Sequence, residues 1–297
     1  MKNLKFSECK KSISNSSNKS KILKFSSVAG FTKDDLLKRA EKRNLIKIPT
    51  IDTVIKMSLE WIKDNTMYIP LPCLIVADFH IPHTSKEWLQ LLCEISDIRK
   101  IKTLMIAGDF FDQDQFKIWM NTGVKVDWDT ELQAGRELFE CLLNQFEKIY
   151  FILGNHDIRI FRALGSIFDV KNLFYQLVPI DLVGVRVFPS NIKYAMTEDK
   201  NWIICHPSNY SKQTIKTPLD IIAIEHKNVI CAHGHHFGSG NDQSGKYIGA
   251  DCGGMFSQDS MTYNGSTVKS SHSKWKNGFV LINEKSDLKL YSDGYEW

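Results

Sequence analysis

The chain has 297 residues, of which 43% are hydrophobic and 24% charged, and its formal net charge is +4 at pH 7. These proportions are typical of a globular protein, and no apolar run approaches the length of a membrane helix, which excludes a membrane-spanning protein. The seven cysteines are scattered without a CxxC pair. Free thiols and the lack of an apolar leader predict a cytoplasmic protein.

The positive charge is concentrated at the start of the sequence. Residues 1–47 contain 13 Lys/Arg and 4 Asp/Glu, so the rest of the chain is mildly acidic. Residues 1–30 are rich in Ser and Lys and lack hydrophobic periodicity, which predicts a flexible basic arm. Two interpretations of the arm stay open: a solvated tail, or a tether that attracts nucleic acid to a catalytic domain.

Residues 31–70 are expected to form a helical N-terminal extension. Apolar residues recur near helical spacing over residues 32–45, where Thr32 is the expected N-cap, and again over residues 51–63. Two consecutive short helices can form a DNA-binding helix-turn-helix, but they also occur as packing elements. Nothing in these segments marks a recognition helix.

From residue 71 the pattern changes to alternating strands and helices. Apolar runs predict buried strands at residues 74–77, 103–107 and 149–153, and amphipathic patterns predict helices from Thr84 to Ile95, with a Thr84–Glu87 capping box, and over residues 131–146. Strands without intervening helices are expected near residues 183–188, 202–205, 228–232, 247–251 and 278–283, with a terminal hairpin at 287–291. This order predicts one α/β domain over residues 71–297 with a largely parallel sheet.

Polar residues that suit metal binding follow five of the predicted strands. They are Asp78-Phe79-His80, Gly108-Asp109-Phe110-Phe111-Asp112, Gly154-Asn155-His156-Asp157, His206, and His233-Gly234-His235. Because open parallel sheets bind ligands at the carboxyl ends of their strands, we expect these segments to meet in one crevice. Carboxylate, amide and imidazole groups favour Mn, Fe, Zn, Co or Ni over a thiolate-type metal site.

In this order, the motifs D-x-H, G-D-x-x-D, G-N-H-D, a single His and H-x-H over residues 73–236 resemble those of the calcineurin-like metallophosphoesterases. The resemblance implies a four-layer α/β/β/α sandwich with a dinuclear metal site at the carboxyl ends of the strands. Three features, Asp78-Phe79-His80-Ile81-Pro82, Arg159 and Trp275-Lys276-Asn277-Gly278-Phe279, are similar to a narrower group, the bacterial and phage DNA-repair-exonuclease-like metallophosphoesterases. That similarity implies a bacterial or phage protein, which in the phage case would work in the host cytoplasm.

The resemblance assigns seven metal ligands to this sequence. They are Asp78, His80 and His235 for one divalent cation, Asn155, His206 and His233 for the other, and Asp109 as the bridge between the two. The expected cations are Mn²⁺, with Fe, Zn, Co or Ni as alternatives. Such a pair of cations clamps phosphoryl oxygens and lowers the pKa of a bridging water, whose hydroxide would attack phosphorus.

The same resemblance assigns catalytic roles to three further residues. His156 follows a ligand without being one and would protonate the leaving oxygen, while Asp157 would orient His156 and stabilise its charge. Arg159 would either reach a phosphate oxygen or pair with an acid. Asp112 is expected to lie behind the ligands.

The sequence departs from the family pattern around its last and second motifs. Ala232 stands where glycine usually precedes the first histidine, and the additional His236 is expected to lie outside the ligand set. The motif that begins with Gly108-Asp109 lacks the Asp-Arg-Gly continuation of the Ser/Thr protein phosphatases. This difference argues against a phosphoprotein substrate.

The first expected function is that of a phosphodiesterase or nuclease acting on DNA, RNA or nucleotides, which the basic arm favours. Phe116, Trp119 and Trp128 would then either stack bases near the crevice or form a hydrophobic cap at its rim. The alternatives are a small-molecule or nucleotide phosphomonoesterase and a non-catalytic nucleic-acid-binding protein with a structural metal cluster. An acid that binds no metal, such as His156, argues against the last alternative. The sequence leaves the oligomeric state open.

Overall fold

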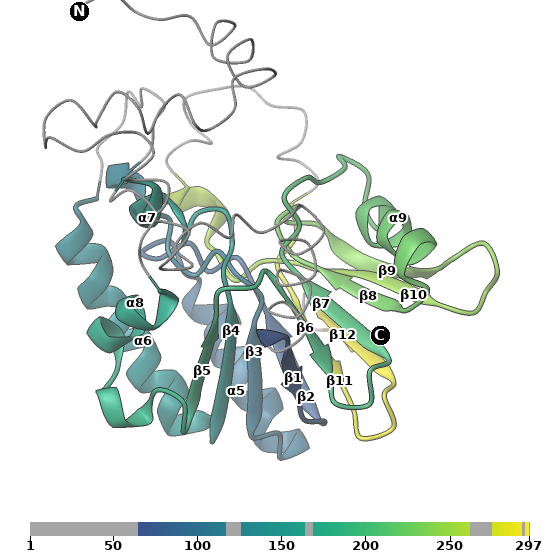
Figure 1. Ribbon diagram of the computed structural model, residues 1–297, viewed down its shortest axis with the longest axis horizontal. Helices are drawn as coiled ribbons and strands as arrows, with labels where there is room; N and C mark the ends of the chain where they lie inside the picture. Colours follow the sequence, from purple (N-terminus) through teal and green to yellow (C-terminus); the bar gives the residue numbers. More distant parts are fainter. Residues whose placement is uncertain (1–64, 117–125, 164–168, 262–274, 293–294, 297) are drawn as a thin grey trace, which may run out of the picture. The chain divides into compact units, whose positions relative to one another are not determined.

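The computed structural model describes residues 65–116, 126–163, 169–261, 275–292 and 295–296 (Figure 1). The basic arm, the helices expected at residues 32–45 and 51–63, and Trp119 lie outside these ranges. The α-helices are α5 (Lys86–Arg99), α6 (Trp128–Gln145), α7 (Arg159–Ala163), α8 (Val170–Leu177) and α9 (Lys216–Glu225). The strands are β1 (Met67–Ile69), β2 (Cys73–Val76), β3 (Thr103–Ile106), β4 (Lys148–Ile152), β5 (Val187–Ser190), β6 (Tyr194–Thr197), β7 (Trp202–Cys205), β8 (Asn228–Cys231), β9 (Phe237–Asn241), β10 (Ile248–Cys252), β11 (Phe279–Ile282), β12 (Leu288–Ser292) and β13 (Tyr295–Glu296).

The strands form two mixed sheets, whereas the alternation of strands and helices in the sequence predicts largely parallel pairing. The seven-stranded sheet has the order β13-β12-β11-β2-β3-β4-β5, in which β2 to β5 are parallel and β11 runs antiparallel to β2. The six-stranded sheet has the order β1-β6-β7-β8-β10-β9, in which β7, β8 and β10 are parallel. The central strands of each sheet are therefore parallel, so their carboxyl ends lie at the same edge of that sheet.

Alternating side chains of the central strands pack into different cores. In β2, Leu74 and Val76 face the core formed with α5, α6 and α8, while Cys73 and Ile75 face the core between the two sheets. A third cluster packs α9, through Ile222, against the outer face of the six-stranded sheet. The order of layers is helix, sheet, sheet, helix, which confirms the expected four-layer α/β/β/α sandwich.

Some elements differ from the sequence expectation. Helices α8 and α9 lie in the region where only strands were expected, so that expectation is wrong. Strand β1 pairs with β6, so the six-stranded sheet begins within the range expected as a helical extension. Helix α5 is capped by Ser85 instead of Thr84, because the Ser85 side chain accepts a hydrogen bond from the Trp88 amide. In the described ranges, all six cysteines are free, and no helix is long and apolar enough to cross a membrane.

Candidate metal centre

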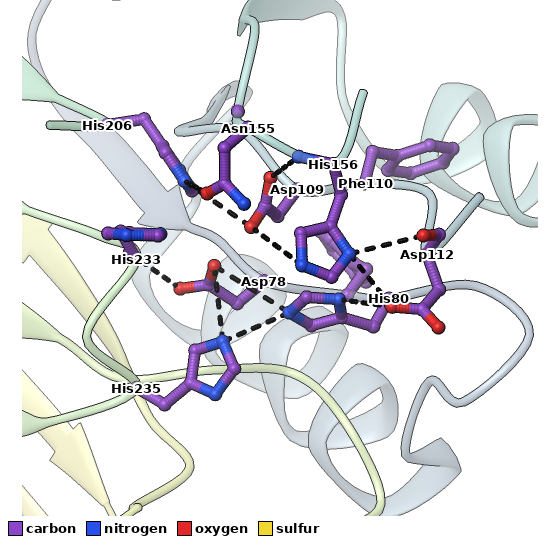
Figure 2. Close-up of polar contacts among 12 residues, drawn as sticks. Asp78, His80, Asp109, Phe110, Asp112, Asn155, His156, His206, His233 and His235 are labelled. Carbon is purple, nitrogen blue, oxygen red and sulfur yellow. Dashed lines mark hydrogen bonds and ion pairs between the residues drawn. The ribbon is translucent and has the colours of Figure 1, made fainter. Parts of the chain in front are cut away.

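The residues expected as ligands lie together at the carboxyl ends of strands from both sheets, and their side chains point toward one another (Figure 2). The seven-stranded sheet supplies Asp78 and His80 after β2, Asp109 after β3 and Asn155 after β4, and the six-stranded sheet supplies His206 after β7 and His233 and His235 after β8. The site therefore sits where the two sheets meet.

The first ligand set consists of Asp78, His80 and His235, which are all buried. The Nε2 atoms of His80 and His235 are 3.0 Å apart, and they lie 3.9 Å and 3.7 Å from Asp78 Oδ1. One ligand atom from each residue lies within 4.8 Å of the other two. These three side chains surround one common point.

The second ligand set contains Asp109, His206 and His233, whose ligand atoms also lie within 4.8 Å of one another. His206 Nε2 is 3.4 Å from Asp109 Oδ2 and 2.9 Å from Asn155 Oδ1. The other ring nitrogen, His206 Nδ1, lies 2.9 Å from the Ala107 carbonyl, which turns Nε2 toward the set. The structure therefore places Asn155 beside the second set, for which the sequence analysis expects it as a ligand.

Two glycines allow the loops that carry the ligands to approach each other. A Cβ atom on Gly154 would lie 2.0 Å from Asp109 Oδ1, and one on Gly108 would lie 2.6 Å from His206 Nδ1. Gly108 also has a φ of +88°, which side chains disfavour. The glycines of the G-D and G-N-H-D motifs are thus required by close packing around the ligands.

Five of the seven expected ligands have a backbone conformation that is rare for residues other than glycine. Their φ angles are positive: 53° for Asp78, 47° for His80, 50° for Asp109, 77° for His233 and 54° for His235. Such conformations cost free energy and persist where the surrounding structure enforces them, commonly at functional sites.

The electrostatics of the first set fit a divalent cation. Asp78 Oδ1 is buried without a hydrogen-bond partner in the part of the chain that the structure describes. Burial raises the pKa of Asp78 well above its usual range, lowers that of His80 to about 4 and lowers that of His235 well below its usual value. The two imidazoles are therefore neutral at pH 7 and can offer lone pairs to a metal, whose charge would stabilise the carboxylate.

The second set has the same character. Asp109 Oδ2 is likewise buried and has no hydrogen-bond partner among the described residues. Although burial raises the pKa of Asp109, His206 and His156 lower it well below its usual range. Burial lowers the pKa of His233 to about 4. Burial also acts to lower the pKa of His206, but the charges of Asp109 and Asp78 and hydrogen bonding together outweigh it and raise that pKa to about 9. A cation in this set would replace the proton on His206.

The partner of His156 is Asp112 rather than the expected Asp157. His156 Nδ1 lies 2.8 Å from Asp112 Oδ1, and the same oxygen lies 3.2 Å from His80 Nδ1 (Figure 2). Asp112 therefore connects a ligand of the first set to the expected general acid.

The carboxylate of Asp157 accepts hydrogen bonds from backbone amides instead of from His156. The expectation that Asp157 orients His156 therefore does not hold. Its Oδ1 accepts hydrogen bonds from Phe110 and Phe111 at 3.0 and 3.1 Å, and its Oδ2 accepts one from Gly154 at 2.8 Å. Asp157 fixes the loop that carries Asp109 against the loop after β4.

The family model of the calcineurin-like phosphoesterases matches residues 71–250. The chain belongs to this family. As a member, it is a phosphoester hydrolase, and its clusters of Asp and His residues indicate that it depends on divalent metal ions.

The solved structures that resemble this chain have low sequence identity to it. No curated protein matches the chain in sequence. Wild-type Vps29 of Entamoeba histolytica in complex with Zn²⁺ has 13% identity and a TM-score of 0.42, with 76% of this chain and 96% of that chain covered. The phosphoesterase Yfce of E. coli has 11% identity and a TM-score of 0.39, with 75% and 93% covered. A predicted phosphoesterase of Streptococcus pneumoniae has 13% identity and a TM-score of 0.35, with 76% and 96% covered.

Two basic residues of this phosphoesterase lie beside the ligands. Arg159 Nη1 donates a hydrogen bond to the Asp112 carbonyl at 2.6 Å, and Nη2 lies 2.9 Å from His156 Nε2. The carbonyl of the half-buried Lys193 accepts a hydrogen bond from the His206 amide at 3.0 Å. In the part of the chain that the structure describes, no carboxylate lies within ion-pair distance of the Lys193 ammonium. Lys193 belongs to no motif, so no pattern in the sequence points to it.

Other aromatic and histidine residues lie near the ligand sets without belonging to them. The ring of Trp128 lies 5.1 Å from that of Phe111 and 5.8 Å from that of Phe116, which supports the interpretation as a hydrophobic cap. His236 is buried outside both ligand sets. His83 is also buried, with Nε2 3.9 Å from Asp112 Oδ2.

Proposed function

We propose that this phosphoesterase is a phosphodiesterase or nuclease that hydrolyses nucleic acids or nucleotides at a dinuclear metal centre. The observation that carries the proposal is the presence of two neighbouring ligand sets, with His156 beside them and outside both. In this proposal, Asp78, His80 and His235 hold one cation, Asn155, His206 and His233 hold the other, and Asp109 bridges them. Mn²⁺ is the first candidate, with Fe, Zn, Co or Ni as alternatives.

When bound, the two cations would neutralise phosphoryl charge and supply a nucleophilic hydroxide. The protein itself supplies the proton for the leaving group. Asp112 accepts a hydrogen bond from His156 Nδ1, so Nε2 is the nitrogen that carries the transferable proton. Since the donor Arg159 Nη2 now lies against Nε2, a substrate phosphate that draws the guanidinium away would free that nitrogen to take up a proton from water and pass it to the leaving oxygen.

Lys193 is a candidate phosphate-binding residue in the same site. Burial lowers the pKa of its ammonium, and Asp109 partly counteracts this effect. A half-buried cation beside the ligands gains a partner when a phosphate oxygen arrives. With Arg159, it would bind the phosphoryl oxygens that the metals do not contact.

Two features support a diester of nucleic acid over a monoester of a small molecule. The excess of Lys and Arg in residues 1–47 would attract polyanions if the arm acts as a tether. In addition, aromatic side chains lie beside two of the histidines that are expected as ligands. A phosphomonoesterase whose small substrates carry no base needs neither feature.

The proposal is tested with chelator-stripped protein that is reloaded with each candidate metal and assayed on four substrates. These are bis-p-nitrophenyl phosphate, p-nitrophenyl phosphate, single-stranded DNA and duplex DNA. We expect turnover of the diester and of DNA only after reloading, with two metals per chain by elemental analysis. Turnover of p-nitrophenyl phosphate alone would favour the phosphomonoesterase.

Asp109→Asn is the matched variant for this assay. Because one carboxylate serves both ligand sets, we expect metal content well below two per chain and loss of turnover on every substrate. Two retained metals with near-normal turnover would contradict the assignment of Asp109 as the bridge.

A further inference from the structure

An exposed tyrosine lies against the second ligand set. Tyr210 is 45% exposed, and its ring centroid is 4.8 Å from that of His233 at an interplanar angle of 90°. The loop that carries it leaves β7 through the ligand His206 and is anchored at the start of α9, where the Ser211 amide donates to Thr217 Oγ1 at 2.8 Å. The Tyr210 hydroxyl has no hydrogen-bond partner in the described ranges. The ring therefore offers an open apolar face next to a ligand.

A tryptophan occupies the equivalent place beside the first ligand set. The Trp275 ring centroid is 4.5 Å from that of His235 and 5.7 Å from that of the buried Phe256. The next residue, Lys276, donates its amide hydrogen bond to the His235 carbonyl at 2.8 Å, which fixes the backbone beside the ring. Trp275 is half-buried beside this ligand.

We propose that Tyr210 and Trp275 are two stacking walls that hold the bases on either side of the scissile phosphate. Each ring contacts a histidine of a different ligand set, so a phosphate bound between the sets has one ring beside each half of its diester. Base stacking on aromatic side chains is favourable for every base and needs no sequence readout. Unpaired bases are required for it. The substrate class is therefore an internal phosphodiester of single-stranded nucleic acid, an inference that rests on the proposed function.

The alternative is that both rings only support the ligand histidines. A supporting ring would affect every substrate alike, because metal binding precedes all turnover. A stacking wall affects only substrates that carry a base on its side. The two roles are separated by removing the base from the substrate as well as the ring from the protein.

The test uses the dinucleotide dT-dT and two analogues in which tetrahydrofuran replaces one base or the other. In the parent protein, removal of either base should lower kcat/KM by roughly 5- to 100-fold, the range expected for loss of one base stack. With Tyr210→Leu, removal of one particular base should no longer matter, while removal of the other still does. Trp275→Leu should show the complementary pattern.

Three controls accompany these variants. Tyr210→Phe and Trp275→Phe keep a ring and should keep the sensitivity to the missing base. Tyr175→Leu removes a tyrosine of similar exposure on α8, at 43%, and should behave as the parent. Metal content is measured for each variant. Binding of fluorescein-labelled oligo(dT) to the metal-free proteins, followed by anisotropy, should weaken for the Leu variants and stay unchanged for Tyr175→Leu.

Equal sensitivity to both missing bases in parent and Leu variants would overturn the proposal, as would loss of sensitivity to the same base in both variants. Tyr210 is exposed, so we expect Tyr210→Leu to fold. This variant tests the stacking role of Tyr210 even if Trp275→Leu fails to fold. Failure of the proposed function looks different. In that case the parent cleaves none of the dinucleotides, whatever stands at positions 210 and 275.

Discussion

At the scale of single residues, His156 separates chemistry from metal binding. His156→Ala should retain two metals and the fold, because the side chain belongs to neither ligand set. It should lower turnover by roughly 10²- to 10⁴-fold on substrates with a poor leaving group, such as a nucleoside alkoxide, which needs a proton to depart. The loss should be smaller for p-nitrophenolate esters. Equal losses on both ester types, or a missing metal, would show that His156 has another role.

Asp112 is expected to act through His156. It contacts His156 Nδ1 at 2.8 Å and therefore sets which ring nitrogen carries the transferable proton. Asp112→Asn should reduce turnover on poor leaving groups by roughly 10-fold or more, and the double variant with His156→Ala should lose little beyond the His156 variant alone. Fully additive losses would mean that Asp112 acts elsewhere, for example through His80, and elemental analysis of metal content would reveal that case.

The sequence indicated which strand-end residues lie together, but it did not indicate which residues support them. The seven expected ligands follow strand ends directly, so the sheet brings them together once the strands are placed. The choice between Asp112 and Asp157 depends on where each loop turns, and the amides of residues 110, 111 and 154 occupy Asp157. Lys193 and Tyr210 lie in irregular segments, where no spacing links them to the site.

At the scale of elements, strands and helices were predicted correctly from the sequence where the segment has a clear pattern of apolar residues. Strands β2, β3, β4, β7, β8, β10 and β11 were predicted near their observed bounds, because each is short, mostly buried and rich in apolar residues. Strand β9 reads Phe-Gly-Ser-Gly-Asn at a sheet edge, which gives no such signal. Helix α9 carries Pro218 in its first turn followed by Ile-rich sequence that suits a buried strand equally well.

The start of α9 depends on a buried carboxyl group. Ile215, which precedes the helix, has a φ of 60°, and its amide donates to Asp251 Oδ2 at 2.5 Å. Burial raises the pKa of Asp251 to about 6. A pKa above the unfolded value means that its stabilising contribution is present below about pH 4 and is lost as the pH rises through 6.

Asp251→Asn should therefore remove part of the pH dependence of stability. The free energy of unfolding of the variant relative to the parent should increase by roughly 1–3 kcal/mol between pH 4.5 and pH 7.5. The amide oxygen of asparagine can still accept the Ile215 hydrogen bond. Urea unfolding at several pH values measures this difference, and other titrating groups cancel because both proteins contain them. A difference independent of pH would argue against a raised pKa at Asp251.

At the scale of the whole molecule, the basic arm is expected to act on polyanionic substrates alone. Deletion of residues 1–30 should leave hydrolysis of bis-p-nitrophenyl phosphate intact, because no expected ligand lies there. If the arm is an electrostatic tether, the deletion weakens DNA binding and makes its dependence on salt concentration less steep. Affinity measured at several salt concentrations decides between tether and solvated tail; unchanged affinity and slope would favour the tail.

The meeting of the two sheets at the ligands has a mechanical consequence. Each cation would take ligands from both sheets and so act as a removable cross-link between them, in the manner of a disulfide. His80 and His235 are 155 residues apart in the chain, and a permanent cross-link over such a loop is worth on the order of 5 kcal/mol in the chain-entropy model. The melting temperature should therefore rise with the concentration of free metal and fall when a chelator is added. The availability of metal would then control the stability of the folded protein as well as its activity.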